Sequence, residues 1–304
     1  ISKDGYNDWD YVMVNHFDDY ADTVTSTDSA SFIDSVIVQS STGRIFMLAD
    51  AQPSECGYLQ AKTGTGYCEI DGKKYLLLTK GNNGDKINTF GYYIGDFEGD
   101  FAPIFTRNDK KITEYSVDRE FRLYKNGEPL YAEQKGSENV KVQQNIFYSS
   151  AELKCYKTTY LWLRYSDDNG KTWSHPQIVS EQVKNEKESF LGVGPGRGMA
   201  INHNGKERIL FCVYDNNGLF KDPIFENASV IYTDDNGETW HRSNKIKIKS
   251  GIGKTSEAQL VKIEGENYKA LRIYARNLSN YIAYADSTDG GETWTTFRAD
   301  KSLE

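Results

Sequence analysis

The decapeptide YSDDNGKTWS at residues 165–174 recurs as YTDDNGETWH at 232–241 and as DSTDGGETWT at 286–295. All of these copies fit the pattern Ser/Thr-x-Asp-x-Gly-x-Thr-Trp. In such a turn the aspartate accepts hydrogen bonds from nearby backbone N–H groups, and the glycine takes a positive φ at low cost. The tryptophan then buries a large aromatic surface against a neighbouring sheet. A turn that is repeated in this way predicts a repeated β-unit.

The same turns are rich in oxygen ligands, so calcium binding is the competing interpretation. An EF-hand loop needs a glycine at its sixth position, a bidentate glutamate at its twelfth and helices on both sides. Here the segments before two of the turns, YLWLRY at 160–165 and SVIY at 229–232, read as strands, and a tryptophan stands at the return. The turns are therefore interpreted as scaffold.

The spacing of the turns predicts propeller blades with one long insertion. Successive full copies begin 67 and 54 residues apart, at Ser166, Thr233 and Ser287, and periods of this order with several strands each are typical of propellers. A degenerate copy, SKDGYNDW at 2–9, begins 164 residues before Ser166, about 97 more than the next interval. We expect each turn to join the third and fourth strands of a four-stranded antiparallel blade.

This spacing divides the chain into three parts. Propeller strands are expected in residues 1–50, an inserted β-rich lobe in 51–147, and further propeller strands in 148–304. The tryptophans of the full turns are expected to be largely buried at equivalent places, namely Trp173, Trp240 and Trp294.

Composition supports an all-β protein and excludes several classes of function. The chain has 21 Tyr, 14 Phe and 5 Trp against 3 Met, which favours half-buried strands over helices. The net charge is −8 without a basic tract, so a nucleic acid is not an expected partner. No run approaches about 20 apolar residues, so no membrane span is expected. The four Cys and four His lack metal-site spacing, and no metal or cofactor is predicted.

Three further segments accompany the turns, namely FLGVGPGRG at 190–198, SEAQLV at 256–261 and IYARN at 273–277. Together with the Asp-box turns they resemble the bacterial sialidases, over nearly the whole chain. IDGKKYLLL and EYSVDREFRLYKNGEPL, within the expected insertion, are similar to the branch that includes intramolecular trans-sialidases. The resemblance implies a six-bladed β-propeller, here incomplete at both ends. It also implies sialylated glycans as the substrate and a secreted or cell-surface location.

The resemblance assigns roles to two residues of the last blade. Glu257, in SEAQ, matches the glutamate that activates the family's tyrosine nucleophile. A neutral nucleophile suits a substrate whose reacting carbon carries a carboxylate, because an attacking carboxylate would be repelled. Arg276, in IYARN, matches one of the arginines that grip this carboxylate, which a planar guanidinium can bind with two hydrogen bonds. Arg272 lies outside the motif, so we expect it to have a surface role.

Two further residues are candidates for substrate binding. Asp34, in FIDSVIV, matches an acidic residue near the sugar hydroxyl groups, and Tyr214, in FCVYDNNG, matches a pocket tyrosine. Without the resemblance, Asp34 would be a turn carboxylate, Tyr214 a half-buried aromatic and Glu257 a solvated strand residue. The glycines of GVGPGRG are expected to shape the backbone near the site.

Four functional residues of the family have no counterpart by motif. They are the first arginine in its Arg-Ile-Pro motif, the acid/base aspartate, the third arginine and the nucleophilic tyrosine. We therefore interpret the chain as the middle of a sialidase that is inactive alone. The alternative from another class is a non-catalytic Asp-box propeller that binds glycans or proteins, but Glu257 and Arg276 favour the enzyme. The sequence leaves open whether the product is released by hydrolysis or by intramolecular transfer.

Overall fold

The computed structural model describes residues 12–17, 29–81, 89–133, 141–216, 226–265 and 268–303. The degenerate turn at 2–9 lies outside these ranges. Within them the chain forms β-strands joined by turns and loops, and the helix α1 (Ser180–Val183) is a single turn. The expectation of an all-β fold is confirmed. No helix in this part of the chain is both long enough and apolar enough to cross a membrane.

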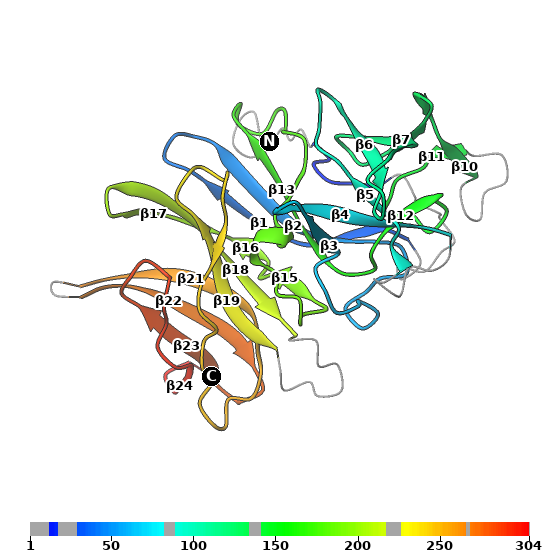
Figure 1. Ribbon diagram of the computed structural model, residues 1–304. Helices are drawn as coiled ribbons and strands as arrows, with labels where there is room; N and C mark the ends of the chain where they lie inside the picture. Colours follow the sequence, from blue (N-terminus) through cyan, green and yellow to red (C-terminus); the bar gives the residue numbers. More distant parts are fainter. Residues whose placement is uncertain are drawn as a thin grey trace.

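Three antiparallel sheets follow one another in space, and we name them blades 1, 2 and 3 (Figure 1). Blade 1 consists of β1 (Ser31–Gln39), β2 (Ile45–Gln52), β13 (Tyr160–Ser166) and β14 (Gln177–Ile178). Blade 2 consists of β15 (Leu191–Val193), β18 (Lys206–Asp215), β19 (Asn227–Thr233) and β20 (His241–Arg242). Blade 3 consists of β21 (Thr255–Gly265), β22 (Tyr268–Asn277), β23 (Ile282–Ser287) and β24 (Arg298–Asp300). Two short strands extend these sheets. In blade 1, β16 (Gly196–Arg197) pairs in parallel with β1, and in blade 2, β17 (Met199–His203) pairs with β18.

Each repeated turn joins the third and fourth strands of its blade, as expected from the sequence. In the turn of blade 2 the Thr233 hydroxyl donates to Asp235 at 2.7 Å and accepts the N–H of Gly237 at 3.0 Å. Asp235 also accepts the N–H of Thr239 at 2.9 Å, and Trp240 Nε1 donates to the carbonyl of Gly237 at 3.1 Å. Gly237 has φ of 95°, which only glycine adopts freely. Blades 1 and 3 repeat these bonds.

A second repeated device lies beside each turn. In each blade an arginine lies in the second strand or immediately before it. This arginine pairs with an aspartate near the turn and stacks on a tyrosine of the third strand. The guanidinium carbon lies 4.0 to 4.3 Å from the ring centroid, within the range of cation–π attraction. These trios are Arg44–Tyr165–Asp167, Arg208–Tyr232–Asp234 and Arg272–Tyr284–Asp286. Arg272 therefore stabilises a blade at a distance from the site residues.

The three turn tryptophans are not equally buried. Trp240 is 3% exposed and stacks on Phe211 with 5.6 Å between ring centroids, whereas Trp173 and Trp294 are only partly buried. The three tryptophans are thus buried to different degrees, fully for Trp240 and partly for the other two. Trp240 packs into the core between blades 1 and 2, while Trp294 packs at the border of the core between blades 2 and 3.

Most of the expected insertion forms a separate sheet. In the sequence, this insertion lies between β2 and β13, the second and third strands of blade 1. Its strands are β3 (Tyr67–Ile70), β4 (Lys73–Lys80), β5 (Tyr92–Ile94), β6 (Phe101–Thr106), β7 (Ile112–Asp118), β8 (Leu123–Lys125), β9 (Glu128–Pro129) and β12 (Leu153–Cys155). A separate pair is formed by β10 (Tyr131–Glu133) and β11 (Lys141–Gln143).

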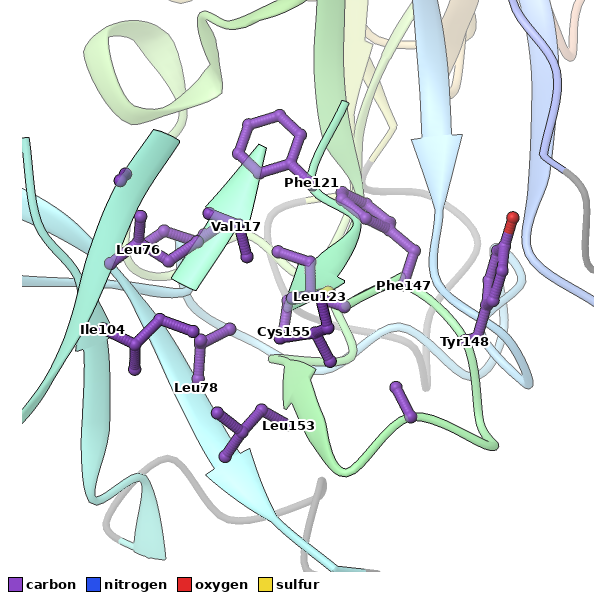
Figure 2. Close-up of a cluster of buried hydrophobic side chains, with 14 of the residues drawn as sticks. Leu76, Leu78, Ile104, Val117, Phe121, Leu123, Phe147, Tyr148, Leu153 and Cys155 are labelled. Atoms are coloured by element: carbon purple, nitrogen blue, oxygen red, sulfur yellow. The ribbon is translucent and has the colours of Figure 1, made fainter. Parts of the chain in front are cut away.

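The insertion packs on the outer side of blade 1 (Figure 1). Its core gathers apolar side chains such as Leu78, Ile104 and Leu123 (Figure 2), and it also includes Tyr160 and Trp162 of β13. The insertion and blade 1 therefore share one core, and β12 joins the insertion's sheet although it follows residue 147. The division at 51–147 stays a prediction.

Side chains of blade 1 hold the first strand of blade 2. The N–H of Leu191 donates to Thr159 Oγ1 at 3.1 Å, and the N–H of Val193 donates to Asp50 Oδ1 at 2.9 Å. Lys184, a buried lysine at the same joint, donates to the carbonyls of Thr159 at 3.1 Å and Ser189 at 3.0 Å. Burial lowers the pKa of Lys184 to about 7, because its acceptors at this joint are uncharged oxygens.

We expect Trp240→Ala to lower the free energy of unfolding by about 3–5 kcal/mol, because it leaves a cavity between two blades. Trp173→Ala and Trp294→Ala should cost less, since solvent already reaches these side chains. Urea denaturation of the three variants measures the difference, and equal losses would contradict this account of the core.

We expect Lys184 to make the free energy of unfolding increase as the pH rises from 7 toward 10.5. The unfolded chain keeps this proton up to the ordinary pKa of 10.5, whereas the folded chain releases it above about pH 7. The unfolded state therefore binds more protons in this window, and unfolding becomes less favourable by up to about 1.4 kcal/mol per pH unit. Lys184→Met should flatten this slope and the exposed Lys262→Met should not, as measured by thermal unfolding across the pH range.

Candidate active site

The candidate site is a pocket of about 500 Å³ where the ends of the three blades meet. Its wall includes all the site residues expected from the sequence, namely Asp34 from β1, Tyr214 from β18, Glu257 from β21 and Arg276 from β22. The registers place these residues at the ends of the strands opposite to the Asp-box turns. Chain segments far apart in the sequence thus bring acidic, basic and phenolic groups together.

Two of the site carboxylates lie at β-bulges. In blade 1, Ile33 pairs with Asp50 and Ser35 pairs with Ala49, so Asp34 is an extra residue with φ of 49°. A positive φ is uncommon outside glycine and is tolerated by aspartate, whose short side chain can bond locally.

In blade 3, Thr255 pairs with Asn277 and Ala258 pairs with Ala275. Two residues, Ser256 and Glu257, therefore oppose the single Arg276. A bulge of this kind redirects a side chain away from the regular alternation of the strand. It places the Glu257 carboxylate beside the Arg276 guanidinium.

Glu257 and Arg276 form an ion pair at the pocket wall. Arg276 Nη1 donates to Glu257 Oε2 at 2.9 Å, and this bond raises the pKa of Arg276. The Arg276 side chain is 71% exposed and the Glu257 side chain 39% exposed, so both can reach a ligand. An exposed guanidinium presents several donors in a plane, which suits a carboxylate with two oxygens.

Burial raises the pKa values of the other expected residues. Burial raises the pKa of Asp34, and the nearby Glu257 raises it further. Burial likewise raises the pKa of Tyr214, with added effects of Asp50, Asp34 and Glu257. Tyr214 therefore keeps its proton at neutral pH and can donate a hydrogen bond into the pocket.

The pocket also contains residues that the sequence did not single out. They include Asp50, Tyr58, Glu226 and Lys254. Asp50 is 1% exposed, and its burial raises its pKa well above the usual range. No motif marks these positions, because each comes from a loop or strand end that only the packing of the blades brings to the pocket. The only signal in the sequence for these residues was that they lie near strand ends that converge on one face of the fold.

Two glycines of GVGPGRG leave room for the site, as expected from the sequence. A Cβ at Gly192 would lie 2.4 Å from Asp50 Oδ2, and one at Gly194 would lie 2.7 Å from the carbonyl oxygen of Ala258. A side chain at Gly194 would therefore push against the backbone of the strand that carries Glu257. These glycines act through close packing of the backbone.

The described parts of the chain contain no cluster of three or more His, Cys, Asp and Glu side chains with the geometry of a metal site. The cysteines are free, and Cys56, Cys155 and Cys212 are buried. Burial raises the pKa of Cys56, which borders the pocket, to about 12, so its thiol is a weak nucleophile.

Comparisons with known proteins agree on one family. Residues 133–302 match the family described as BNR repeat-like domain. Anhydrosialidase of Macrobdella decora is 33% identical over 97% of this chain and 40% of its own length. Sialidase B of Streptococcus pneumoniae is 30% identical over 77% of this chain and 32% of its own length.

A solved structure gives the same result. The intramolecular trans-sialidase from Ruminococcus gnavus, in complex with oseltamivir carboxylate, matches with a TM-score of 0.82 and 34% identity. The match covers 99% of this chain and 63% of that one. The chain thus spans less than two thirds of each of these three relatives.

Proposed function

Because this chain belongs to the sialidase family, with a BNR repeat-like domain and relatives among the intramolecular trans-sialidases, we propose that it is part of an exo-α-sialidase. The proposed enzyme removes terminal sialic acid from sialylated glycans, either by hydrolysis or by intramolecular transfer. The observation that carries the proposal is the Glu257–Arg276 pair in a pocket built from three blades. A pure scaffold does not need an exposed arginine and glutamate at this place.

Arg276 is proposed to bind the substrate carboxylate with its planar guanidinium. In the structure this guanidinium is paired with Glu257 at 2.9 Å. An incoming carboxylate would compete for the same donors, so substrate binding would free Glu257 for chemistry. Glu257 then acts as the base that activates the nucleophile.

Asp34 and Tyr214 are proposed to position the sugar. Asp34 accepts hydrogen bonds from ring hydroxyl groups, and Tyr214, which keeps its proton, donates one. A phenol held in its protonated form by burial and by four nearby carboxyl groups is suited to binding rather than to attack. We therefore propose that the nucleophilic tyrosine, the acid/base aspartate and the other two arginines come from outside these 304 residues.

We also propose the finer features of the fold on the basis of the resemblance. The complete domain has six blades, of which three are described here, and residues 51–147 form an inserted lobe. We propose a secreted or cell-surface location, where sialylated glycans are accessible.

Product analysis tests this function. The full-length protein should release either free sialic acid or an anhydro form lighter by one water from sialyllactose, as detected by mass spectrometry. The chain of 304 residues alone should release neither, because catalytic groups that act as a unit lose nearly all activity when a member is absent. A full-length protein that binds sialosides but releases neither product would instead be a non-catalytic glycan-binding propeller.

We expect Glu257→Gln to lower turnover about 10²–10⁴-fold in the full-length protein, because the amide keeps the shape and loses the base. The melting temperature should change little, since the side chain is partly exposed at the pocket wall. Initial rates with a fluorogenic sialoside measure the effect. Near-normal turnover would remove Glu257 from the mechanism.

We expect Arg276→Lys to weaken substrate binding strongly, because an ammonium group cannot reproduce the planar, two-bond grip. The matched control is Arg298→Lys, which changes an arginine paired with Asp286 at 3.0 Å away from the pocket. KM and kcat for both variants decide the matter. Similar values for Arg276→Lys and the control would contradict the assignment.

A further inference from the structure

A buried lysine near the pocket has no role in the function proposed above. Lys184 follows α1 and is 6% exposed, and its ammonium group lies in the joint between blades 1 and 2. This group donates to Thr158 Oγ1, to the carbonyl of Thr159 at 3.1 Å and to the carbonyl of Ser189 at 3.0 Å. An ammonium group has three hydrogens to donate and no lone pair, so each of its hydrogens is used at this joint.

The bond to Ser189 connects the lysine to an aromatic part of the pocket wall. Asn216 holds this segment, because its side chain donates to Ser189 Oγ at 2.7 Å and accepts the N–H of Phe190 at 3.0 Å. The Phe190 ring lines the pocket and packs against Tyr58 and Tyr214, with 4.8 and 5.1 Å between ring centroids. The position of this ring therefore depends on the backbone at Ser189, which the ammonium group holds.

The bond to Thr158 connects the lysine to a second part of the wall. The Thr158 hydroxyl group lies 3.0 Å from the carbonyl of Gly64 and 2.9 Å from the carbonyl of Ser189, and it can donate its hydrogen to either. The Ser189 carbonyl already accepts from the ammonium group, so the hydroxyl hydrogen is needed at Gly64. Gly64 belongs to the loop between β2 and β3, which also carries Tyr58. We name this segment the β2–β3 loop.

The two charge states of Lys184 require different hydrogen bonds. The ammonium form can only donate, so Thr158 accepts from it and gives its own hydrogen to Gly64. The neutral amine has two hydrogens, which the two carbonyls use, and one lone pair. That lone pair faces Thr158 Oγ1, so the hydroxyl group must turn its hydrogen to the amine or oppose two lone pairs. Loss of the proton therefore costs the β2–β3 loop its bond to Thr158.

The surroundings bring this change close to neutral pH. Burial lowers the pKa of Lys184 to about 7, against the opposing effects of Cys56, Glu188, Glu186 and Asp50. The acceptors of the ammonium group are a hydroxyl oxygen and two carbonyl oxygens, so its charge is desolvated without a hydrogen-bonded carboxylate. Cys56 and Asp50 also line the pocket. The charge of Lys184 is thus felt at the place where a ligand would lie.

We propose that Lys184 is a positioning residue whose charged form holds Phe190 and the β2–β3 loop in their ligand-binding arrangement, which couples ligand binding to protonation of Lys184. This inference rests on the sialidase function proposed above, which supplies the anionic ligand. Coupling of this kind is reciprocal, so a ligand that binds the charged form better also favours proton uptake by the same factor. Ligand affinity should therefore fall as the pH rises through 7, and binding above pH 7 should take up protons.

Calorimetry of the full-length protein with 2,3-unsaturated sialic acid, which has no leaving group to lose, tests this coupling. Between pH 6 and pH 8.5 the affinity of the unchanged protein should fall severalfold, up to about thirtyfold. The upper value is the drop in the charged fraction of a group with a pKa of about 7, since only the competent fraction binds. Repeated titrations in buffers of different ionisation enthalpy should show an uptake of up to about one proton per ligand at pH 8.

Two variants and a control separate this role from a merely structural one. Lys184→Met should lose most of the pH dependence. Thr158→Val should show a low affinity that varies little with pH, because it keeps the lysine but lacks the loop bond. The control Lys157→Met removes a lysine that pairs with Glu55 of the same loop at 2.6 Å, and it should keep the pH dependence. A Lys184→Met protein with the same pH dependence as the unchanged protein would overturn the proposal.

Hydrogen exchange without ligand distinguishes failure of this proposal from failure of the sialidase function. After correction for the intrinsic exchange rate at each pH, peptides from the β2–β3 loop should lose protection between pH 6 and pH 8.5. Lys184→Met should show no such change, because the Thr158 hydroxyl group can donate to Gly64 at every pH. A pH-dependent loop in a protein that releases no product would support the coupling and refute the enzyme. Product release with protection that does not depend on pH would support the enzyme and refute the coupling.

Discussion

Satisfaction of the backbone N–H groups along β15 is the constraint on which the joint between blades 1 and 2 depends. A strand edge that is buried against another sheet needs partners for its polar groups, or it costs free energy for each one. Thr159 and Asp50 of blade 1 supply these partners for Leu191 and Val193. The two blades are thereby fixed with their pocket ends together, and Asp50 becomes part of the pocket wall.

The two ends of each blade serve different purposes. At one end, the repeated turns satisfy their polar groups within a few residues, and the arginine–tyrosine–aspartate trios add a second local lock. At the other end, polar groups find partners across blades, as in the bond of Tyr58 to Glu226. The turn end closes mainly through local bonds, and Arg208 adds bonds to the Gly290 carbonyl and to Glu292 of blade 3. The pocket end is assembled only when the blades pack, and that is where a ligand can compete for the same groups.

The pocket departs from regular β-structure at the positions of its carboxylates. Asp34 is the extra residue of a bulge, with a positive φ, and Glu257 lies in a second bulge opposite Arg276. A regular strand would alternate these side chains between the two faces of a blade. The bulges interrupt this alternation, and both carboxylates line the pocket at the ends of the strands. Strain and irregularity of this kind are often found at functional sites, where the surrounding sheet maintains them.

The sequence by itself determined the all-β class, the blade turns with their hydrogen bonds, and the place of each turn between the third and fourth strands. These features are local, because the groups that define a turn lie within eight residues of one another. The sequence also predicted Asp34, Tyr214, Glu257 and Arg276 as site residues, since each lies in a segment that resembles a family motif.

Only the tertiary structure decided which of these side chains share a pocket, and it added Asp50, Tyr58, Glu226 and Lys254. It also decided that Trp240 is buried while Trp173 and Trp294 are only partly buried, although the three turns are nearly identical. The reason is the same in both cases. Burial and convergence depend on which neighbouring blade packs against a residue, and that neighbour is far away in the sequence.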